Sequence, residues 1–270
     1  MGIFYLYCDL SYDGTANVKG APHIPRTYVF AGFFADDTTW GIVEDKWVAV
    51  NMEYGVPRFH AAHLYAKSNE YEGWDNARKV AYSSELLSIM KAEGKRLNAV
   101  SCGIFADEYR KIISEDGQRK MGSPYLVCFN SCITLIAKMM DAPNAFPPQD
   151  TFSVVIDSDD GYLEAIESYR KMEQNSKFPC RRRLGMCSPS NTEKIVPLQA
   201  ADMAAYEVFR RLHSARDGGT SIRHPLKVMM EDNVVDERYY SADTLMSLKA
   251  EIEATPATTG YGELVIIPRS

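Results

Sequence analysis

The sequence predicts an α/β protein built on a mixed sheet that is flanked by helices. Strand-like segments come first in the chain, strands and helices then alternate, and neither an internal repeat nor a long linker divides the chain. Apolar residues make up 46% and charged residues 24% of the chain, which excludes a disordered or collagenous protein. We therefore expect residues 1–270 to form a single domain, with a helical and strand extension over about 214–270.

The first half of the chain is expected to contain three strands and two helices. Ile3–Asp9 and Thr27–Ala35 are rich in aromatic and other apolar side chains and end at turn residues, so both are predicted to be strands. A helix should run through Trp40–Glu53, because threonine caps precede it and glycine and proline follow it. An apolar stripe predicts a second helix over Asp75–Ala92, and Leu97–Phe105 is the third strand candidate.

The second half is expected to alternate between helices and strands. Pro124–Met140 is nearly all apolar, which predicts a helix that is buried on most sides. Prolines then break the chain before the strand Thr151–Asp157, and an amphipathic helix follows over Gly161–Gln174. Lys177–Asn191 is expected to be a loop or an irregular strand. Pro197–His213 should be a helix, with proline in its first turn.

The tail and the ends of the chain carry weaker signals. A helix is expected near Ala242–Glu253 and a last short strand at Leu264–Ile267. No stretch approaches the roughly 18 uninterrupted apolar residues of a membrane span, and the first residues lack the basic region and cleavage site of a signal peptide. The six cysteines have no framework spacing, so reduced thiols are expected. We therefore expect a cytoplasmic protein with no membrane partner, and nothing in the sequence indicates its oligomeric state.

The charge of the chain is unevenly spread. The chain has 30 Lys+Arg and 36 Asp+Glu, a net charge of −6, but Ser168–Lys227 holds 12 basic and 5 acidic residues, a local +7. Such asymmetry indicates either a phosphate-bearing partner such as nucleic acid or an ordinary solvated surface. If the partner is nucleic acid, we expect Arg181, Arg182 and Arg183 to bind its backbone as substrate-binding residues.

Three aspartates occupy apolar positions, where burying a charged carboxylate without a partner destabilises the fold. Asp9 and Asp157 end apolar strands, and strand ends usually present the chemistry of an α/β fold. Asp202 lies on the same helix face as Leu198 and Phe209, so it is expected to be buried against the sheet. Three aspartates converging on one edge would suit Mg²⁺ or Mn²⁺, which prefer oxygen ligands. Taken singly, each is also explained as a capping, turn or salt-bridged acid.

Four segments follow one another over about residues 3–213: Tyr7–Asp13, Arg58–Tyr65 with its continuation to Gly73 and Trp74, Val154–Asp157 and Pro197–Tyr206. In this order they resemble the motifs of an uncharacterised family called domain of unknown function 3800. The last segment contains the family's Leu-Gln-x-Ala-Asp helix, the most distinctive of the four motifs. The resemblance implies a ribonuclease-H-like fold, whose site normally gathers about four acids around two divalent ions.

The match to this family is incomplete. Leu10 stands where the family has glutamate, Tyr12 where it has glycine, and His63 where the second motif has glutamate. The matching residues are Asp9, Ser11, Asp13, His60, Asp157, Gln199 and Asp202. The chain therefore keeps three aspartates and lacks one or two flanking carboxylates. Weaker metal binding, the use of His63 as a ligand, and loss of catalysis all remain open.

His60 and His63 are candidates for proton transfer or metal binding, and both are also explained as surface or packed residues.

We expect a metal-dependent nuclease or phosphodiesterase in which Asp9, Asp157 and Asp202 are the catalytic metal ligands. Ser11 and Gln199 are candidate substrate-binding residues. The alternatives are an inactive ribonuclease-H-like binding module, associated with defence or mobile elements, and a hydrolase of a small phosphorylated molecule. No motif for a nucleotide cofactor or a serine hydrolase is present.

Overall fold

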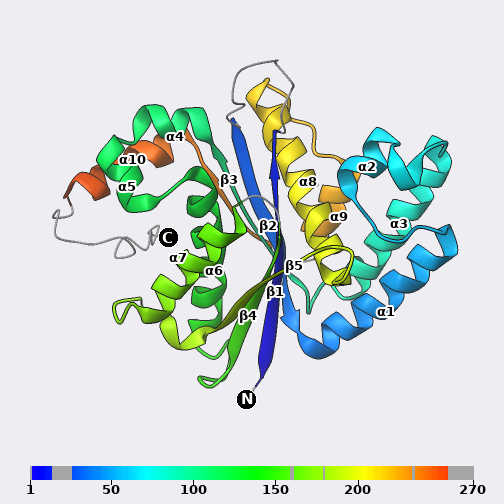
Figure 1. The fold of residues 1–270 in the computed structure, drawn as a ribbon, viewed down its shortest axis with the longest axis horizontal. Helices are drawn as coiled ribbons and strands as arrows, with labels where there is room; N and C mark the ends of the chain where they lie inside the picture. Colours follow the sequence, from blue (N-terminus) through cyan, green and yellow to red (C-terminus); the bar gives the residue numbers. More distant parts are fainter. Residues whose placement is uncertain (1, 14–25, 159–160, 179, 233–234, 255–270) are drawn as a thin grey trace.

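The chain forms one mixed sheet of six strands in the order β5-β4-β1-β2-β3-β6 (Figure 1). The computed structural model describes residues 2–13, 26–158, 161–178, 180–232 and 235–254. The strands are β1 (Ile3–Tyr12), β2 (Thr27–Asp36), β3 (Asn98–Phe105), β4 (Thr151–Asp157), β5 (Leu184–Ser190) and β6 (Val235–Tyr240). The expected α/β class, with a mixed sheet flanked by helices, is confirmed.

The direction of the strands divides the sheet into two parts. β2 is antiparallel to both β1 and β3, whereas β1, β4 and β5 run parallel to one another, as do β3 and β6. Parallel neighbours end at the same edge of a sheet. Cys8 of β1 lies opposite Ile156 of β4 and opposite Gly32 of β2. The carboxyl ends of β1, β4 and β5 therefore meet, and this edge carries the residues described below.

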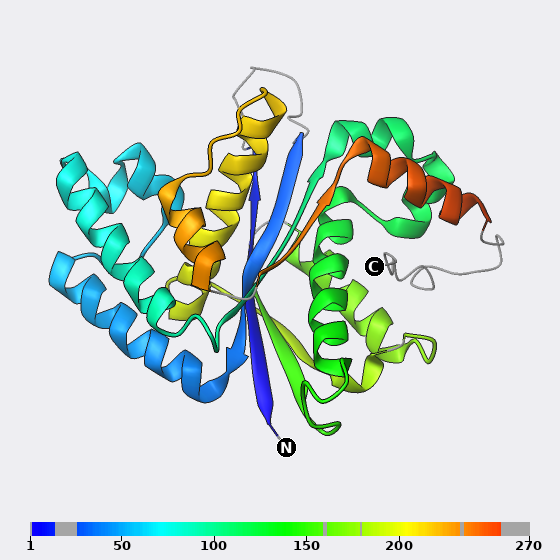
Figure 2. The ribbon, with the colours of Figure 1, turned by 180° about the vertical axis from the view of Figure 1, so that it is seen from behind.

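Helices cover both faces of the sheet, as the two opposite views show (Figures 1 and 2). The first layer consists of α4 (Ala106–Ile112), α5 (Glu115–Met121), α6 (Pro124–Asp141), α7 (Tyr162–Gln174) and α10 (Ala242–Ala254). The second layer consists of α1 (Asp37–Tyr54), α2 (Ala61–Ala66), the 3₁₀ turn η1 (Asn69–Tyr71), α3 (Asn76–Ala92), α8 (Val196–Arg216) and α9 (His224–Asp232). A second 3₁₀ turn, η2 (Arg181–Arg183), precedes β5.

The alternation of side chains along β1 and β2 produces two separate cores. Cys8 and Leu10 pack with α6 in the first layer. Ala31 and Phe33 of β2 pack with α1, α3 and α8 in the second layer. Because successive side chains of a strand point to opposite faces, a residue between Cys8 and Leu10 faces α8. Helix α8 lies directly against β1 and β2 and begins with a proline in its first turn.

Several segments differ from expectation. β1 continues to Tyr12, since Ser11 and Tyr12 still pair with β2, so Asp9 lies inside the strand and not at its end. Phe59–Tyr65, which is short and ambiguous in the sequence, contributes most of α2, whereas the irregular strand expected as one alternative within Lys177–Asn191 is confirmed: it is β5, which follows η2 and pairs with β4 with a shift of register. Helices α4, α5 and α9 and strand β6 were not expected, because these short polar segments lack a clear periodicity. The expected strand Leu264–Ile267 lies outside the described residues.

Among the described residues, no single helix is long and apolar enough to cross a membrane. Helices α5 and α6 reach the required length and composition only as a pair, and they are bent by 44° relative to each other.

Candidate functional site

Asp9 and Asp157 lie side by side on the face of the sheet that α8 covers. Asp9 is opposite Ala31, a residue of the second core, and its chain neighbours face the first core. Asp157 follows the residue that pairs with Cys8, so it occupies the next position along β4, beside Asp9. Neighbouring strands are about 4.8 Å apart. The Asp9 Oδ1 atom accepts a hydrogen bond from the Leu10 N–H at 2.8 Å.

Asp202 approaches this pair from α8. Its side chain is buried, and its Oδ2 atom accepts hydrogen bonds from the Ala61 N–H at 2.8 Å and lies 3.0 Å from the His60 Nδ1 atom. Burial raises the pKa of the Asp157 carboxyl, the hydrogen bond from the Ser158 N–H opposes this rise, and the negative charge of Asp202 adds to it. Helix α8, which carries Asp202, packs against β1 and β4 on the same face of the sheet. All three expected aspartates thus lie on one side of the sheet.

The two histidines connect Asp202 to a fourth carboxylate. The ring centroids of His60 and His63 are 4.0 Å apart, and the His63 Nδ1 atom lies 3.3 Å from a Glu70 carboxyl oxygen. Burial lowers the pKa of His60, but the hydrogen bond and the charge of Asp202 outweigh it, so the pKa lies above its ordinary value. Glu70 was not identified from the sequence, because it follows His63 beyond a short helix and belongs to no motif.

Arg58 adds a cation to the same edge. Its side chain is 27% exposed, and its Nη1 atom lies 3.4 Å from the Thr192 Oγ1 atom and 3.2 Å from a Glu193 carboxyl oxygen. Its positive charge lowers the pKa values of both Asp157 and His60, although neither effect is the largest on its group. Arg58 belongs to the segment that resembles the family motif, but nothing in its spacing indicated a role.

Gln199 is a buried connector between several segments. Its Oε1 atom accepts hydrogen bonds from Trp47 Nε1 at 3.0 Å, Asn51 Nδ2 at 3.1 Å and the Phe59 N–H at 2.8 Å. Its Nε2 atom donates to the Thr192 carbonyl at 2.9 Å. The side chain is 1% exposed, so its amide is engaged within the protein instead of facing a substrate. We therefore assign Gln199 a positioning role.

Ser11, the other candidate substrate-binding residue, is half-buried on β1. It lies two positions beyond Asp9, and residues two apart on a strand face the same side. It therefore borders the carboxylates on the α8 face of the sheet.

Arg181, Arg182 and Arg183 lie at the other end of the sheet. η2 leads directly into β5, where Leu184 pairs with Phe152, and β4 rises about 16 Å from Phe152 to Asp157. Arg183 is 2% exposed; its Nε atom donates to Asp141 at 2.7 Å and its Nη2 atom to the Met140 carbonyl at 2.7 Å.

Further carbonyl oxygens of the loop before β4 also accept hydrogen bonds from the Arg183 guanidinium, at Phe146, Pro147 and Asp150. Arg182, which is 61% exposed, lies 2.9 Å from the same Asp141 carboxylate, and Arg181 is exposed. The segment expected to bind phosphate thus contains an ion-pair network that holds the loop before β4. We leave these three arginines out of the candidate site.

The donor atoms at this edge suit a hard divalent cation. Among the described residues, no three His, Cys, Asp or Glu side chains are grouped closely enough to hold a metal ion as they stand. Mg²⁺ commonly uses one or two carboxylates and completes its shell with water and substrate phosphate. The adjacent carboxylates of Asp9 and Asp157 offer that number of oxygen donors, so the residues fit such an ion.

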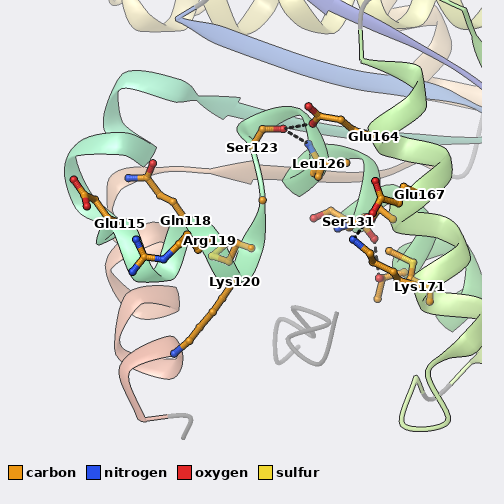
Figure 3. A pocket seen from close by; sticks show the side chains of 16 residues that line it. Glu115, Gln118, Arg119, Lys120, Ser123, Leu126, Ser131, Glu164, Glu167 and Lys171 are labelled. Atoms are coloured by element: carbon orange, nitrogen blue, oxygen red, sulfur yellow. Dashed lines mark hydrogen bonds and ion pairs between the residues drawn. The ribbon is translucent and has the colours of Figure 1, made fainter. Parts of the chain in front are cut away.

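A pocket of about 680 Å³ lies on the opposite face of the sheet, between α5, α6 and α7 (Figure 3). Its charged lining residues balance, with three acidic and three basic side chains: Glu115, Glu164, Glu167, Arg119, Lys120 and Lys171. Lys171 pairs with Glu167 at 2.8 Å, and Lys120 pairs with Asp116 at 3.0 Å. Neither an excess of charge nor an aspartate cluster selects a ligand here, so we place the candidate site at the α8 face.

Comparison of the chain with family models, with curated proteins and with solved structures found no match.

Proposed function

We propose that this chain is a metal-dependent phosphodiesterase of ribonuclease-H-like type that acts on nucleic acid. The observation that carries the proposal is the gathering of Asp9 of β1, Asp157 at the end of β4 and Asp202 of α8 on one face of the sheet. Burial and the charge of Asp202 raise the pKa of Asp157, and a perturbed carboxyl of this kind is common at functional sites. A mixed sheet with helices on both faces supports the ribonuclease-H-like assignment.

The side chains divide into holding and proton-transfer roles. Asp9 and Asp157 would hold Mg²⁺ or Mn²⁺, which, when bound, supplies an activated water and stabilises charge on the scissile phosphate. Asp202 orients His60 by accepting from its Nδ1 atom, which leaves Nε2 as the atom that takes up or delivers a proton. His63, which stands where the family has glutamate, packs against His60 and is itself oriented by Glu70.

An inactive binding module is the second candidate. It is favoured by the state of Asp202, whose Oδ2 atom already has two hydrogen-bond partners. An oxygen engaged in this way is less available as a metal ligand. In this reading the same edge would bind nucleic acid without cleaving it.

Calorimetric titration with Mn²⁺, combined with cleavage assays on labelled RNA, single-stranded DNA and duplex DNA, tests the proposal. Wild type should bind Mn²⁺ and cleave at least one substrate, whereas Asp157→Asn should do neither. Asp217→Asn, which neutralises a carboxylate that is 75% exposed at the end of α8, is the matched control and should behave as wild type. Binding of nucleic acid without Mn²⁺ binding or cleavage would favour the inactive module.

A further inference from the structure

Arg58 is a cation held next to a cluster of carboxylates, with most of its hydrogen-bonding capacity unused. We propose that its guanidinium binds a backbone phosphate of the nucleic acid beside Asp157. This inference rests on the proposed function and assigns the residue that receives the substrate. A guanidinium suits the task because its planar donors match two phosphate oxygens at once.

The backbone around Arg58 is held in place on both sides. The Tyr71 hydroxyl donates to the Arg58 carbonyl at 2.9 Å, and the His60 N–H donates to the same hydroxyl at 3.2 Å. Gln199 accepts from the N–H of Phe59, the residue between them. Three consecutive residues are thus fixed by buried side chains. A binding group on a backbone of this kind is preorganised, which lowers the entropic cost of ligand binding.

The side-chain amide of Gln199 also fixes the segment that carries Thr192 and Glu193. Gln199 also donates to the Thr192 carbonyl, and Thr192 and Glu193 are the side chains that Arg58 contacts. The segment that follows β5 is therefore held against the segment that carries Arg58. β5 ends where Ser190 pairs with Asp157, so the segment with Thr192 and Glu193 begins next to the Asp157 carboxylate.

The present contacts of Arg58 are weak. Within the described part of the chain, its side-chain partners are Thr192, at a long 3.4 Å, and Glu193, which is 66% exposed. An exposed ion pair contributes little, and both contacts use the same Nη1 atom. A guanidinium has five N–H donors, so most of them remain available for a phosphate.

The charge of the site explains why a cation is needed. Asp9, Asp157 and Asp202 would repel a polyanion unless positive charge faces it. Arg58 is two residues from His60, which contacts Asp202, and its side chain contacts Thr192, two residues beyond the Ser190 that pairs with Asp157. The denser arginine segment at η2 is engaged with Asp141 at the far end of the sheet and does not supply this charge.

The test compares Arg58→Gln with Arg182→Gln, which removes the same charge from an arginine that pairs with Asp141. Binding of a short fluorescein-labelled oligonucleotide to the full chain would be measured by anisotropy over a range of KCl concentrations, in chelator so that cleavage does not interfere. Arg58→Gln should lower the slope of log affinity against log salt by about 1 and weaken binding roughly tenfold or more. Arg182→Gln should change neither.

Arg58→Lys serves as a second variant, because it keeps the charge and loses the planar donors. It should retain the wild-type salt slope and still bind more weakly. Thermal midpoints of all three variants close to that of wild type would show that folding is unaffected. A fall in the midpoint of Arg58→Gln alone would leave Arg58→Lys as the deciding variant, and unchanged affinity there would overturn the proposal.

The outcomes separate the inference from the proposed function. If wild type binds and cleaves the oligonucleotide and Arg58→Gln has an unchanged slope, the function stands and the role of Arg58 is wrong. If wild type binds no oligonucleotide, both are wrong. If inorganic phosphate raises the thermal midpoint of wild type and not that of Arg58→Gln while wild type binds no oligonucleotide, Arg58 binds a small phosphate, and the assignment to nucleic acid is overturned.

Discussion

Charged side chains at the η2 end of the sheet are paired with opposite charges, whereas those on the α8 face lie beside like charges. At the η2 end, Arg183 is buried and donates to one carboxylate and to several carbonyl oxygens, so its charge is fully engaged. At the α8 face, Asp157 is held beside Asp202, and its pKa is raised by burial and by that like charge. The first arrangement stabilises the protein, whereas the second is costly unless a cation binds.

The difference shows that charge density along a sequence does not reveal available charge. Three consecutive arginines form the most basic segment of the chain, but one of them is among the most deeply buried residues. The isolated Arg58 has weak partners, and it is two residues from His60, which contacts Asp202. Whether a charged side chain is free to bind a ligand depends on the groups that the fold places around it. The following substitutions measure this at the η2 end of the sheet and at the α8 face.

The largest effect is expected for Arg183→Met. It leaves the Asp141 carboxylate without its buried partner and leaves several loop carbonyls without donors. Breaking a buried pair costs about 3–5 kcal/mol, which should lower the thermal midpoint on the order of 10 °C. Scanning calorimetry of the variant measures this. A loss of stability of only about 0 to 1 kcal/mol, as for an exposed ion pair, would mean that Arg183 does not stabilise the η2 end as described.

Gln199→Leu should have the second largest effect. The substitution removes the acceptor of three buried donors, from Trp47, Asn51 and Phe59, at an expected cost of about 2–4 kcal/mol in the free energy of unfolding. Urea denaturation checks the value. Gln174→Leu, at an exposed position on α7, is the matched control and should be near neutral. Equal stability of the two variants would remove the argument that Gln199 holds the Arg58 segment.

Asp157→Asn should have a smaller effect of opposite sign. The folded-state pKa of Asp157 is raised, so its favourable contribution is complete below the unfolded pKa of about 4 and is lost as pH rises through the folded value. In chelator, wild type should therefore lose stability relative to the variant between acid and neutral pH. Thermal midpoints measured across this range should converge at low pH and separate at pH 7, with the variant higher. A lower midpoint for the variant at pH 7 would indicate a stabilising partner for Asp157.

Arg182→Met should have the smallest effect. The side chain is 61% exposed, and such pairs contribute between 0 and about 1 kcal/mol. The variant differs from Arg183→Met by one position and involves the same Asp141 carboxylate. If calorimetry showed similar losses of stability for Arg182→Met and Arg183→Met, the ion-pair network would depend on both arginines, and the exposure of an arginine would not indicate its contribution to stability.

The predictable parts of the protein were those with local patterns. The strand carrying Asp157 and the helix carrying Asp202 follow from apolar runs, proline positions and helical spacing, which are properties of short windows. The neighbourhood of Arg58, Glu70 and Gln199 was not predictable, because it depends on contacts between α2, α8 and the segment before α8. The arginines at η2 were interpreted as a binding segment because sequence counts charge without showing its partners.

The parallel pairing of β1 with β4 has a consequence for how the protein is made. Asp9 and Asp157 are joined across a long stretch of chain, and closing such a contact is slower than forming the antiparallel pairs of β1, β2 and β3. During synthesis, the N-terminal strands emerge first and can pair while the outer edge of β1 is still open. The repulsive carboxylate cluster is completed only when Asp202 has left the ribosome. The most costly part of the fold is therefore added after strands β1 to β5 have been synthesised.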